Sequence, residues 1–452
     1  HIITLMKGKL SIKEKILHGF GDLGYATVAQ TLSNFIMFFG TSILGISGTL
    51  MGIAVSIGVL WDAISDPLLG YISDNTYTSM GKRHPYLFIG TLGMCAINLI
   101  IWLVPPSSPE IVKFLWILVS LLLVQTFCTF FATPYLALGL EMTKDPNEQT
   151  SLQSYRTVFS LLGMMLPSVF MFVFMPSSSG GQGQFNITGY VNTAYVSSLF
   201  CLICGLITFF GTLKHGVCCK VDYPIKKDKF SSIFNDFFNM LKKKNYRNII
   251  LGYSVSLIAS STLTAAGIQM FTYCFHFNSQ QLSIAMIALI FGAIFSQFYW
   301  TKKSIKNGKK STLIHGLCVG TLGILMIWVV FVLRDMFSTT LLFFITLPLI
   351  TFAGFGTGVL YTLPISIFSD ILASDKELVG KDKTATYSGI MTLSNKIANA
   401  FSLFLIGIVL DAIKFNSSYP VQPASVQFGL GYLVILGVAL SLVLSIYFYK
   451  KV

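Results

Sequence analysis

Charged residues are scarce in this chain. Asp, Glu, Lys and Arg make up 11% of its 452 residues, whereas 54% of the residues are hydrophobic and the mean hydropathy is +0.72. Soluble domains carry roughly 25% charged residues. The composition therefore excludes an ordinary soluble domain and predicts an integral membrane protein.

Sequence patterns of enzyme sites are also missing. The six His are scattered along the chain, and it contains no Gly-rich nucleotide loop, metal-ligand cluster or nucleophile elbow. The eight Cys follow no regular spacing, which predicts packing residues rather than a disulfide framework or a metal site. We therefore expect a protein that is not an enzyme and that uses no cofactor.

Long apolar runs fill most of the chain. A membrane-spanning helix needs about 20 mostly apolar residues, and twelve such runs can be marked, six on each side of a polar connection at 214–248. We expect an all-α membrane protein with twelve transmembrane helices in two six-helix bundles. The expected boundaries are a tail at 1–16, a bundle at 17–213, the connection at 214–248, a second bundle at 249–449 and a tail at 450–452.

Basic residues outnumber acidic ones, and the formal net charge is +13. They fall in short loops rather than on one soluble face, so we expect no binding of nucleic acid. With a cytoplasmic N-terminus, 26 of the 31 Lys and Arg lie in inner loops and tails. This asymmetry predicts that both termini are cytoplasmic and that the chain is a multi-pass protein of the cell membrane.

Two acids interrupt the second apolar run. Asp62 and Asp66 are four residues apart and therefore share one face of a helix. A charge at mid-membrane costs at least about 2.5 kcal/mol, and neighbouring carboxylates repel each other unless a proton or a cation lies between them. We predict that the pair binds Na⁺ or a proton. Thr129 is a weaker candidate because Thr hydroxyls in helices commonly bond to their own backbone.

Three further charged residues lie within apolar runs. Asp22 either complements the start of the first helix or faces a pore, and Arg156 either snorkels to the interface or lines a cavity. Lys396 stands about eight residues or more from each end of its run, which is too deep for easy snorkelling. Lys396 is therefore the strongest substrate-site candidate in the second half.

Several motifs together resemble one known family. The sequence WDAISDP at 61–67, with GKRHP at 81–85, resembles the signature of the glycoside-pentoside-hexuronide:cation symporters of the major facilitator superfamily, whose best-known member is the melibiose permease. The similarity extends along the chain through FGDLG at 20–24, TPYLAL at 133–138, SYR at 154–156, Asp370, Tyr387 and Lys396.

This resemblance implies three groups of functional residues. The coupling cation would bind Asp62, Asp66 and Thr129, with Asp62 and Asp66 as the metal ligands if the ion is Na⁺. The substrate would contact Asp22, Arg156, Lys396 and Tyr387, and an inner gate would contain Asp74, Gly81, Lys82 and Arg83.

The chain departs from the melibiose permease at two positions. That protein has sugar-binding acids on helices one and four, and the matching residues here are Ala26 and Ala132. The lysophospholipid transporter of vertebrates is similar in the same motifs.

The leading hypothesis is Na⁺- or H⁺-driven symport of a sugar or glycoside by alternating access, and the alternative is transport of a lysophospholipid or other amphiphile. A membrane enzyme and a passive channel are weaker alternatives. We expect a monomer whose partners are this small molecule, the cation and membrane lipids.

Overall fold

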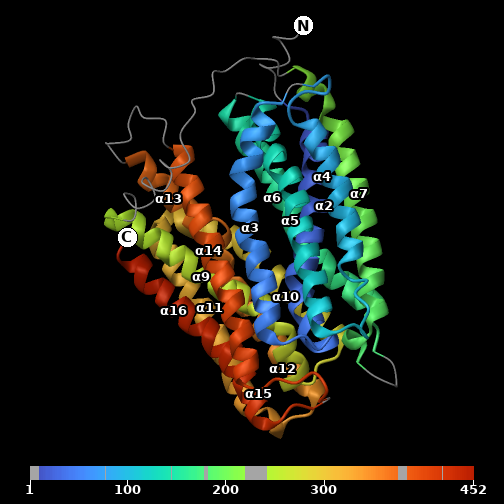
Figure 1. Ribbon diagram of the computed structural model, residues 1–452. Helices are drawn as coiled ribbons and strands as arrows, with labels where there is room; N and C mark the ends of the chain where they lie inside the picture. The colour runs from blue at the N-terminus through green and yellow to red at the C-terminus, as the bar shows by residue number, and fades with distance from the viewer. Residues whose placement is uncertain are drawn as a thin grey trace. The chain divides into compact units, whose positions relative to one another are not determined.

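The fold is built from helices. The computed structural model describes residues 10–76, 78–143, 145–177, 182–218, 242–374, 384–419 and 421–452, and every regular element in these ranges is helical. Figure 1 shows the long α-helices, and short 3₁₀ and π segments stand between some of them. The predicted all-α class is confirmed.

Two compact units make up the chain. The first comprises His1–Ile46 and Ile57–Tyr223, and the second comprises Ser47–Ser56 and Pro224–Val452. One helix, α3 (Gly48–Asp74), therefore begins in the second unit and continues into the first.

The first unit packs five further long helices with the larger part of α3. Helix α2 lies against α6 and α7, while α4 lies against α5 and α7. The elements are α2 (Ile12–Phe38), the π segment η1 (Phe39–Ile43), α4 (His84–Ile100), α5 (Glu110–Glu141), α6 (Pro146–Phe174), η2 (Gly183–Phe185) and α7 (Ile187–Cys218).

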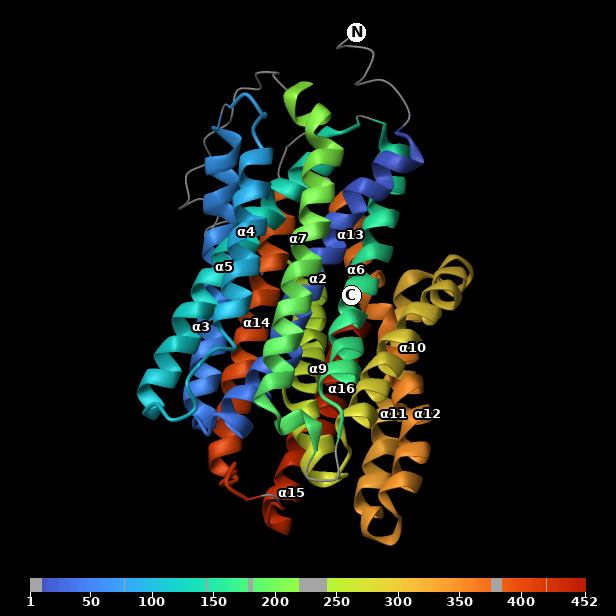
Figure 2. The same cartoon turned by 90° about the vertical axis from the view of Figure 1, so that its right-hand side faces the viewer.

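The second unit is also helical. Helix α12 packs against α10 and α11, which lie beside it in Figure 2, and α9 packs against α14 and α16. The elements are α9 (Lys244–Cys274), α10 (Ser279–Asn307), α11 (Lys309–Val332), η3 (Arg334–Met336), α12 (Thr339–Thr357), η4 (Gly358–Tyr361), α13 (Leu363–Ser374), α14 (Thr384–Ala412), α15 (Ala424–Gly431), η5 (Tyr432–Leu436) and α16 (Gly437–Lys450).

Most of these helices can cross a membrane. Among the described residues, 10 helical segments are long and apolar enough to do so by length and composition. Helix α4 is apolar but has 17 residues, and the 27-residue α2 carries Lys13, Glu14, Lys15 and Asp22, which lower its hydropathy. The number twelve therefore stays a prediction.

Glycines bring the helices of the first unit into backbone contact. A Cβ atom on Gly163 of α6 would lie 2.5 Å from the Leu23 carbonyl oxygen of α2. Small residues permit such close approach between membrane helices. Because Arg156 lies two turns before Gly163, and Asp22 precedes Leu23, this contact brings the two charged residues close together.

The first turns of α3 pack against α14 within the second unit. The backbone N–H groups of Gly48 and Thr49 donate to the two carboxylate oxygens of Asp411, at 2.7 and 2.8 Å. A carboxylate at a helix N-terminus satisfies free N–H groups and interacts favourably with the helix dipole. A Cβ atom on Gly48 would also lie 2.5 Å from the Gly407 carbonyl oxygen, so only glycine permits this approach.

Candidate functional site

Two carboxylates and two hydroxyls meet between α3 and α5 in the first unit. Asp62 and Asp66 are half-buried and lie one turn apart on α3. The Thr129 hydroxyl donates to Asp62 Oδ1 at 3.0 Å, and the Thr133 hydroxyl donates to Asp66 Oδ1 at 3.4 Å. Each acid therefore has a hydroxyl partner on the neighbouring helix.

A third hydroxyl extends this cluster. Ser65 Oγ and Thr129 Oγ1 are 3.0 Å apart, and both residues are buried. The sequence predicted Thr129 as a cation ligand, but it did not predict Ser65 or Thr133. A usable signal was the spacing of Thr126, Thr129 and Thr133, which places all three on one face of α5, because residues three, four and seven apart lie on the same side of a helix.

This set of oxygen atoms restricts the ions that could bind. Carboxylate and hydroxyl oxygens are hard ligands, which suit hard cations or a proton rather than soft transition metals. In the part of the chain that the structure describes, no group of three or more His, Cys, Asp or Glu residues is placed to hold a metal ion. The acidic pair with its hydroxyls is thus suited chemically to Na⁺ or H⁺.

Asp22 and Arg156 form a buried ion pair between α2 and α6. Arg156 Nε lies 2.8 Å from Asp22 Oδ2, and their side chains are 11% and 12% exposed. Arg156 Nη1 also donates to Gln153 Oε1 at 2.7 Å. Both charges lie about ten residues inside their helices, roughly three turns, so neither serves merely to complement a helix terminus.

An aromatic side chain supports this ion pair. The Arg156 guanidinium carbon lies 5.0 Å from the centre of the Tyr135 ring, and the His18 ring stacks on that ring with centroids 4.4 Å apart. The Tyr135 hydroxyl donates to the His18 carbonyl oxygen at 2.8 Å. A Cβ atom on Gly21 would lie 2.6 Å from the Tyr135 ring, so α2 holds this side chain closely. Tyr135 lies within the TPYLAL sequence, and its packing role was not predicted.

Arg83 connects the ends of two helices. This residue is buried, and its Nη2 atom lies 2.5 Å from Asp74 at the end of α3 and 2.7 Å from Glu141 at the end of α5. Nη1 donates to Ser73 Oγ at 2.9 Å. Burial lowers the pKa of Arg83, but the Glu141 and Asp74 carboxylates outweigh burial and raise that pKa above its usual value. Asp74 and Arg83 are thus brought together, and Glu141 and Ser73 join them.

Gly81 turns the loop that carries Arg83. Its φ of 92° lies in the region that L-residues rarely adopt. The Gly81 N–H donates to the Thr78 carbonyl oxygen at 3.0 Å, while the Thr78 hydroxyl donates to the Gly81 carbonyl oxygen at 2.6 Å. Lys82 follows in the same loop and is half-buried.

In the second unit, Lys396 is half-buried on α14. Beside it, two uncharged Ser–Asn pairs join α9 to α14, and we call these pairs the neutral ladder. Ser254 of α9 donates to Asn395 Oδ1 at 3.1 Å, and Ser261 donates to Asn399 Oδ1. Tyr387 also belongs to α14, but its side chain lies outside the described residues.

The chain is similar to known transport proteins along almost its whole length. A family model described as MFS/sugar transport protein matches residues 17–450. A bacterial homologue of the human lysosomal transporter Spinster has the same fold, with a TM-score of 0.66 and 12% identity over 97% of this chain and 94% of that one.

Three relatives indicate the range of proteins to which this sequence is similar. An uncharacterised symporter of Synechocystis, sll1374, is 25% identical over 94% of this chain and 90% of its own length. The sodium-dependent lysophosphatidylcholine symporter 1 of Xenopus tropicalis is 24% identical over 95% of this chain and 84% of its own length. The putative glycoside/cation symporter YagG of Escherichia coli is 23% identical, with coverages of 92% and 86%.

Proposed function

The chain belongs to the MFS/sugar transport protein family. We propose that it is a secondary active symporter that moves a sugar or glycoside together with Na⁺ or H⁺. It is a multi-pass membrane transporter and not an enzyme. We further propose twelve spans, with α2 and α4 completing the set, both termini in the cytoplasm and function as a monomer.

The cation proposal rests on the cluster between α3 and α5. Asp62 and Asp66 stand within a helix long and apolar enough to span the membrane, and each accepts a hydrogen bond from α5. Placing two acids there is unfavourable unless a positive ion or proton compensates them. We therefore assign cation binding to Asp62, Asp66 and Thr129, with Ser65 and Thr133 as additional oxygen donors.

Symport requires that cation occupancy change the balance between two conformations. Neutralising Asp62 and Asp66 would favour the outward-open state that accepts substrate, and alternating access would then carry both ligands across. Coupling of this kind typically amounts to about 1–3 kcal/mol, or 5- to 150-fold in affinity. The Arg83 cluster, which joins the ends of α3 and α5, is the proposed inner gate, with Asp74, Gly81 and Lys82 in the same loop region.

The substrate proposal rests on the polar pair in the first unit. Asp22 can accept hydrogen bonds from sugar hydroxyls, and Arg156 can donate to their oxygens. The similarity to the putative glycoside/cation symporter YagG supports this substrate class. Lys396 and Tyr387 remain proposed substrate contacts of the second unit.

Asparagine substitutions test the cation site directly. In proteoliposomes with an imposed Na⁺ or H⁺ gradient, D62N and D66N should each reduce sugar accumulation by at least about tenfold, because coupling energy is lost. The control is D335N, which removes an acid that is 86% exposed in the second unit and should transport normally. Undiminished gradient-driven uptake in both D62N and D66N would refute the proposal.

A lysophospholipid is the second candidate substrate. The similarity to the lysophosphatidylcholine symporter of Xenopus tropicalis favours it, as does Arg156, since guanidinium groups bind phosphate well. Uptake of labelled lysophosphatidylcholine, competed by a panel of sugars and glycosides with and without Na⁺, separates the two. Saturable lysolipid uptake that no sugar competes would replace the sugar proposal.

A further inference from the structure

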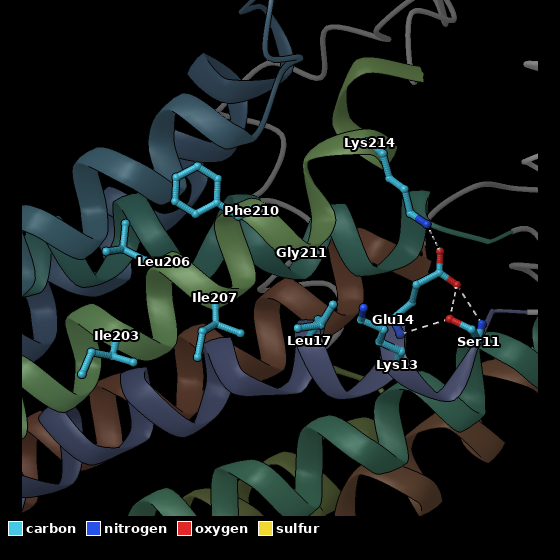
Figure 3. Close-up of a pocket in the computed structure, with 10 residues that line it drawn as sticks. All are labelled: Ser11, Lys13, Glu14, Leu17, Ile203, Leu206, Ile207, Phe210, Gly211 and Lys214. Carbon is cyan, nitrogen blue, oxygen red and sulfur yellow. Dashed lines mark hydrogen bonds and ion pairs between the residues drawn. The ribbon is translucent and has the colours of Figure 1, made fainter.

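An open groove lies between α2 and α7 in the first unit. Figure 3 shows side chains of both helices around it, and its volume is about 760 Å³. Its wall is apolar over most of its length and contains Leu17, Ile203, Leu206, Ile207 and Phe210. A Cβ atom on Gly211 would lie 2.8 Å from Leu17 Cβ, so the two helices approach closely beside the groove.

Part of the apolar wall is exposed. Ile203 and Phe210 of α7 are 50% and 67% exposed, and Leu199, which lies one turn before Ile203 on the same side of the helix, is 59% exposed. In a membrane protein, an exposed apolar face of a spanning helix faces the lipid chains. The groove is therefore a recess on a lipid-facing surface.

One end of the groove is charged. Lys13 and Lys214 line this end together with Glu14. Lys214 Nζ lies 2.7 Å from Glu14 Oε1, yet the Lys214 side chain is 60% exposed and an ammonium group has three N–H donors. Lys13 is exposed on the first turn of α2. Both lysines can therefore donate to a ligand at this end.

Glu14 does not cancel the positive charge of this end. Burial raises the pKa of Glu14, but hydrogen bonds from Lys214, Ser11 and His215 outweigh burial and lower that pKa to about 2. Glu14 thus carries one negative charge at neutral pH, and His215 Nε2 lies 3.0 Å from it. Among the described residues that line this end, two lysines and one carboxylate give a net positive charge.

We propose that this groove binds an anionic glycerophospholipid of the surrounding bilayer. Its phosphate accepts hydrogen bonds from Lys13 and Lys214, and one acyl chain lies along Ile203, Ile207 and Phe210. The distribution of polar groups supports this occupant, since Lys13, Glu14 and Lys214 lie outside the expected bundle at 17–213, whereas the apolar wall lies inside it. Basic residues at the cytoplasmic end of membrane helices commonly bind anionic headgroups.

The test measures lipid retention by the full chain in detergent. Native mass spectrometry after titration with palmitoyl-oleoyl phosphatidylglycerol should show one retained lipid, and K13Q/K214Q should weaken its retention about 10- to 30-fold. The matched control K302Q/K306Q removes two exposed lysines of α10 and should retain the lipid normally. I203W fills the apolar groove while leaving both lysines in place, and it should weaken retention as well.

The ligands and the folding of the variants complete the design. Palmitoyl-oleoyl phosphatidylcholine should bind much more weakly than phosphatidylglycerol, and glycerol 3-phosphate without acyl chains should not be retained. Equal retention of both phospholipids, retention of glycerol phosphate alone, or unchanged retention in both K13Q/K214Q and I203W would overturn the proposal. Melting curves recorded without added lipid confirm that each variant is folded.

Discussion

The two units treat polar side chains in different ways. In the first unit, Asp22 and Arg156 form a buried charged pair, and the buried Arg83 meets Glu141, which is 30% exposed. In the second unit, α9 and α14 are joined by uncharged pairs, including Ser261 with Asn399. Neutral hydrogen bonds between membrane helices contribute only about 0.6 kcal/mol each, whereas a buried charge costs several times more unless it is paired. This difference supports a role for the first unit in energy coupling and for the neutral ladder in helix packing.

Breaking the buried ion pair should have the largest effect. R156Q leaves the Asp22 carboxylate without its guanidinium partner, and removal of one member of a buried pair costs about 3–5 kcal/mol. We therefore expect a strongly lowered melting temperature in detergent and loss of uptake in proteoliposomes.

A double variant separates folding from transport in this experiment. D22N/R156Q removes both charges and should recover much of the lost stability, while uptake stays lost because the proposed substrate contacts are gone. K309Q, which breaks the more exposed Lys309–Asp370 pair of the second unit, serves as the control. If R156Q melts like the unmodified protein, the proposed contrast between the units is wrong.

Removing Arg83 should have the next largest effect. R83Q loses hydrogen bonds to Asp74 and Glu141, and bonds to charged groups contribute about 1.5–3 kcal/mol. Because Asp74 is 46% exposed, we expect a value near the lower limit. Hydrogen exchange should increase at the adjoining ends of α3 and α5, and the exposed Arg247 provides a control variant, R247Q. Unchanged protection at both helix ends would contradict this interpretation.

The contacts that sequence reasoning could predict were mainly local in the chain. Asp62 and Asp66 are one turn apart, so their shared face follows from helix geometry alone. The Asp22–Arg156 pair joins residues separated by 134 positions, and its formation depends on the packing of α2 against α6 through Gly163. Sequence therefore identified these two charged residues individually, while their pairing required the fold.

The contacts at helix ends also depend on the fold and could not be predicted from local sequence. The GKRHP sequence indicated a functional loop, but Arg83 finds Glu141 only because α5 ends beside α3. Likewise, the residues next to Asp411 in the sequence do not predict that its carboxylate caps the N-terminus of α3, which begins 363 residues earlier. The apolar runs predicted the helices well, because burial in lipid requires continuous apolar sequence. Interhelical polar contacts depend on which faces meet, and a single sequence does not specify that.

The hydroxyls around the acidic pair should have moderate and unequal effects. T129V removes a donor 3.0 Å from Asp62 and should weaken cation affinity about tenfold, as expected for a hydrogen bond to a charged group. T133V should have a smaller effect because its 3.4 Å contact with Asp66 is near the limit of a hydrogen bond. The Na⁺ or H⁺ concentration for half-maximal uptake measures both. The control is T193V, because the Thr193 hydroxyl donates within α7. A larger effect of T133V than of T129V would contradict the assigned order.

Removing hydroxyls from the neutral ladder should have the smallest effect. S254A and S261A each delete one bond from α9 to α14 and should cost about 0.6 kcal/mol. The two serines lie two turns apart and bond to different asparagines, so their effects on the melting temperature should add in the double variant. Uptake should change by less than about twofold because no charge is left unpaired. If S261A instead destabilises the protein as strongly as R156Q, the neutral ladder contributes more than ordinary hydrogen bonds between packed helices. Lys396 beside it would then become the residue to examine for coupling in the second unit.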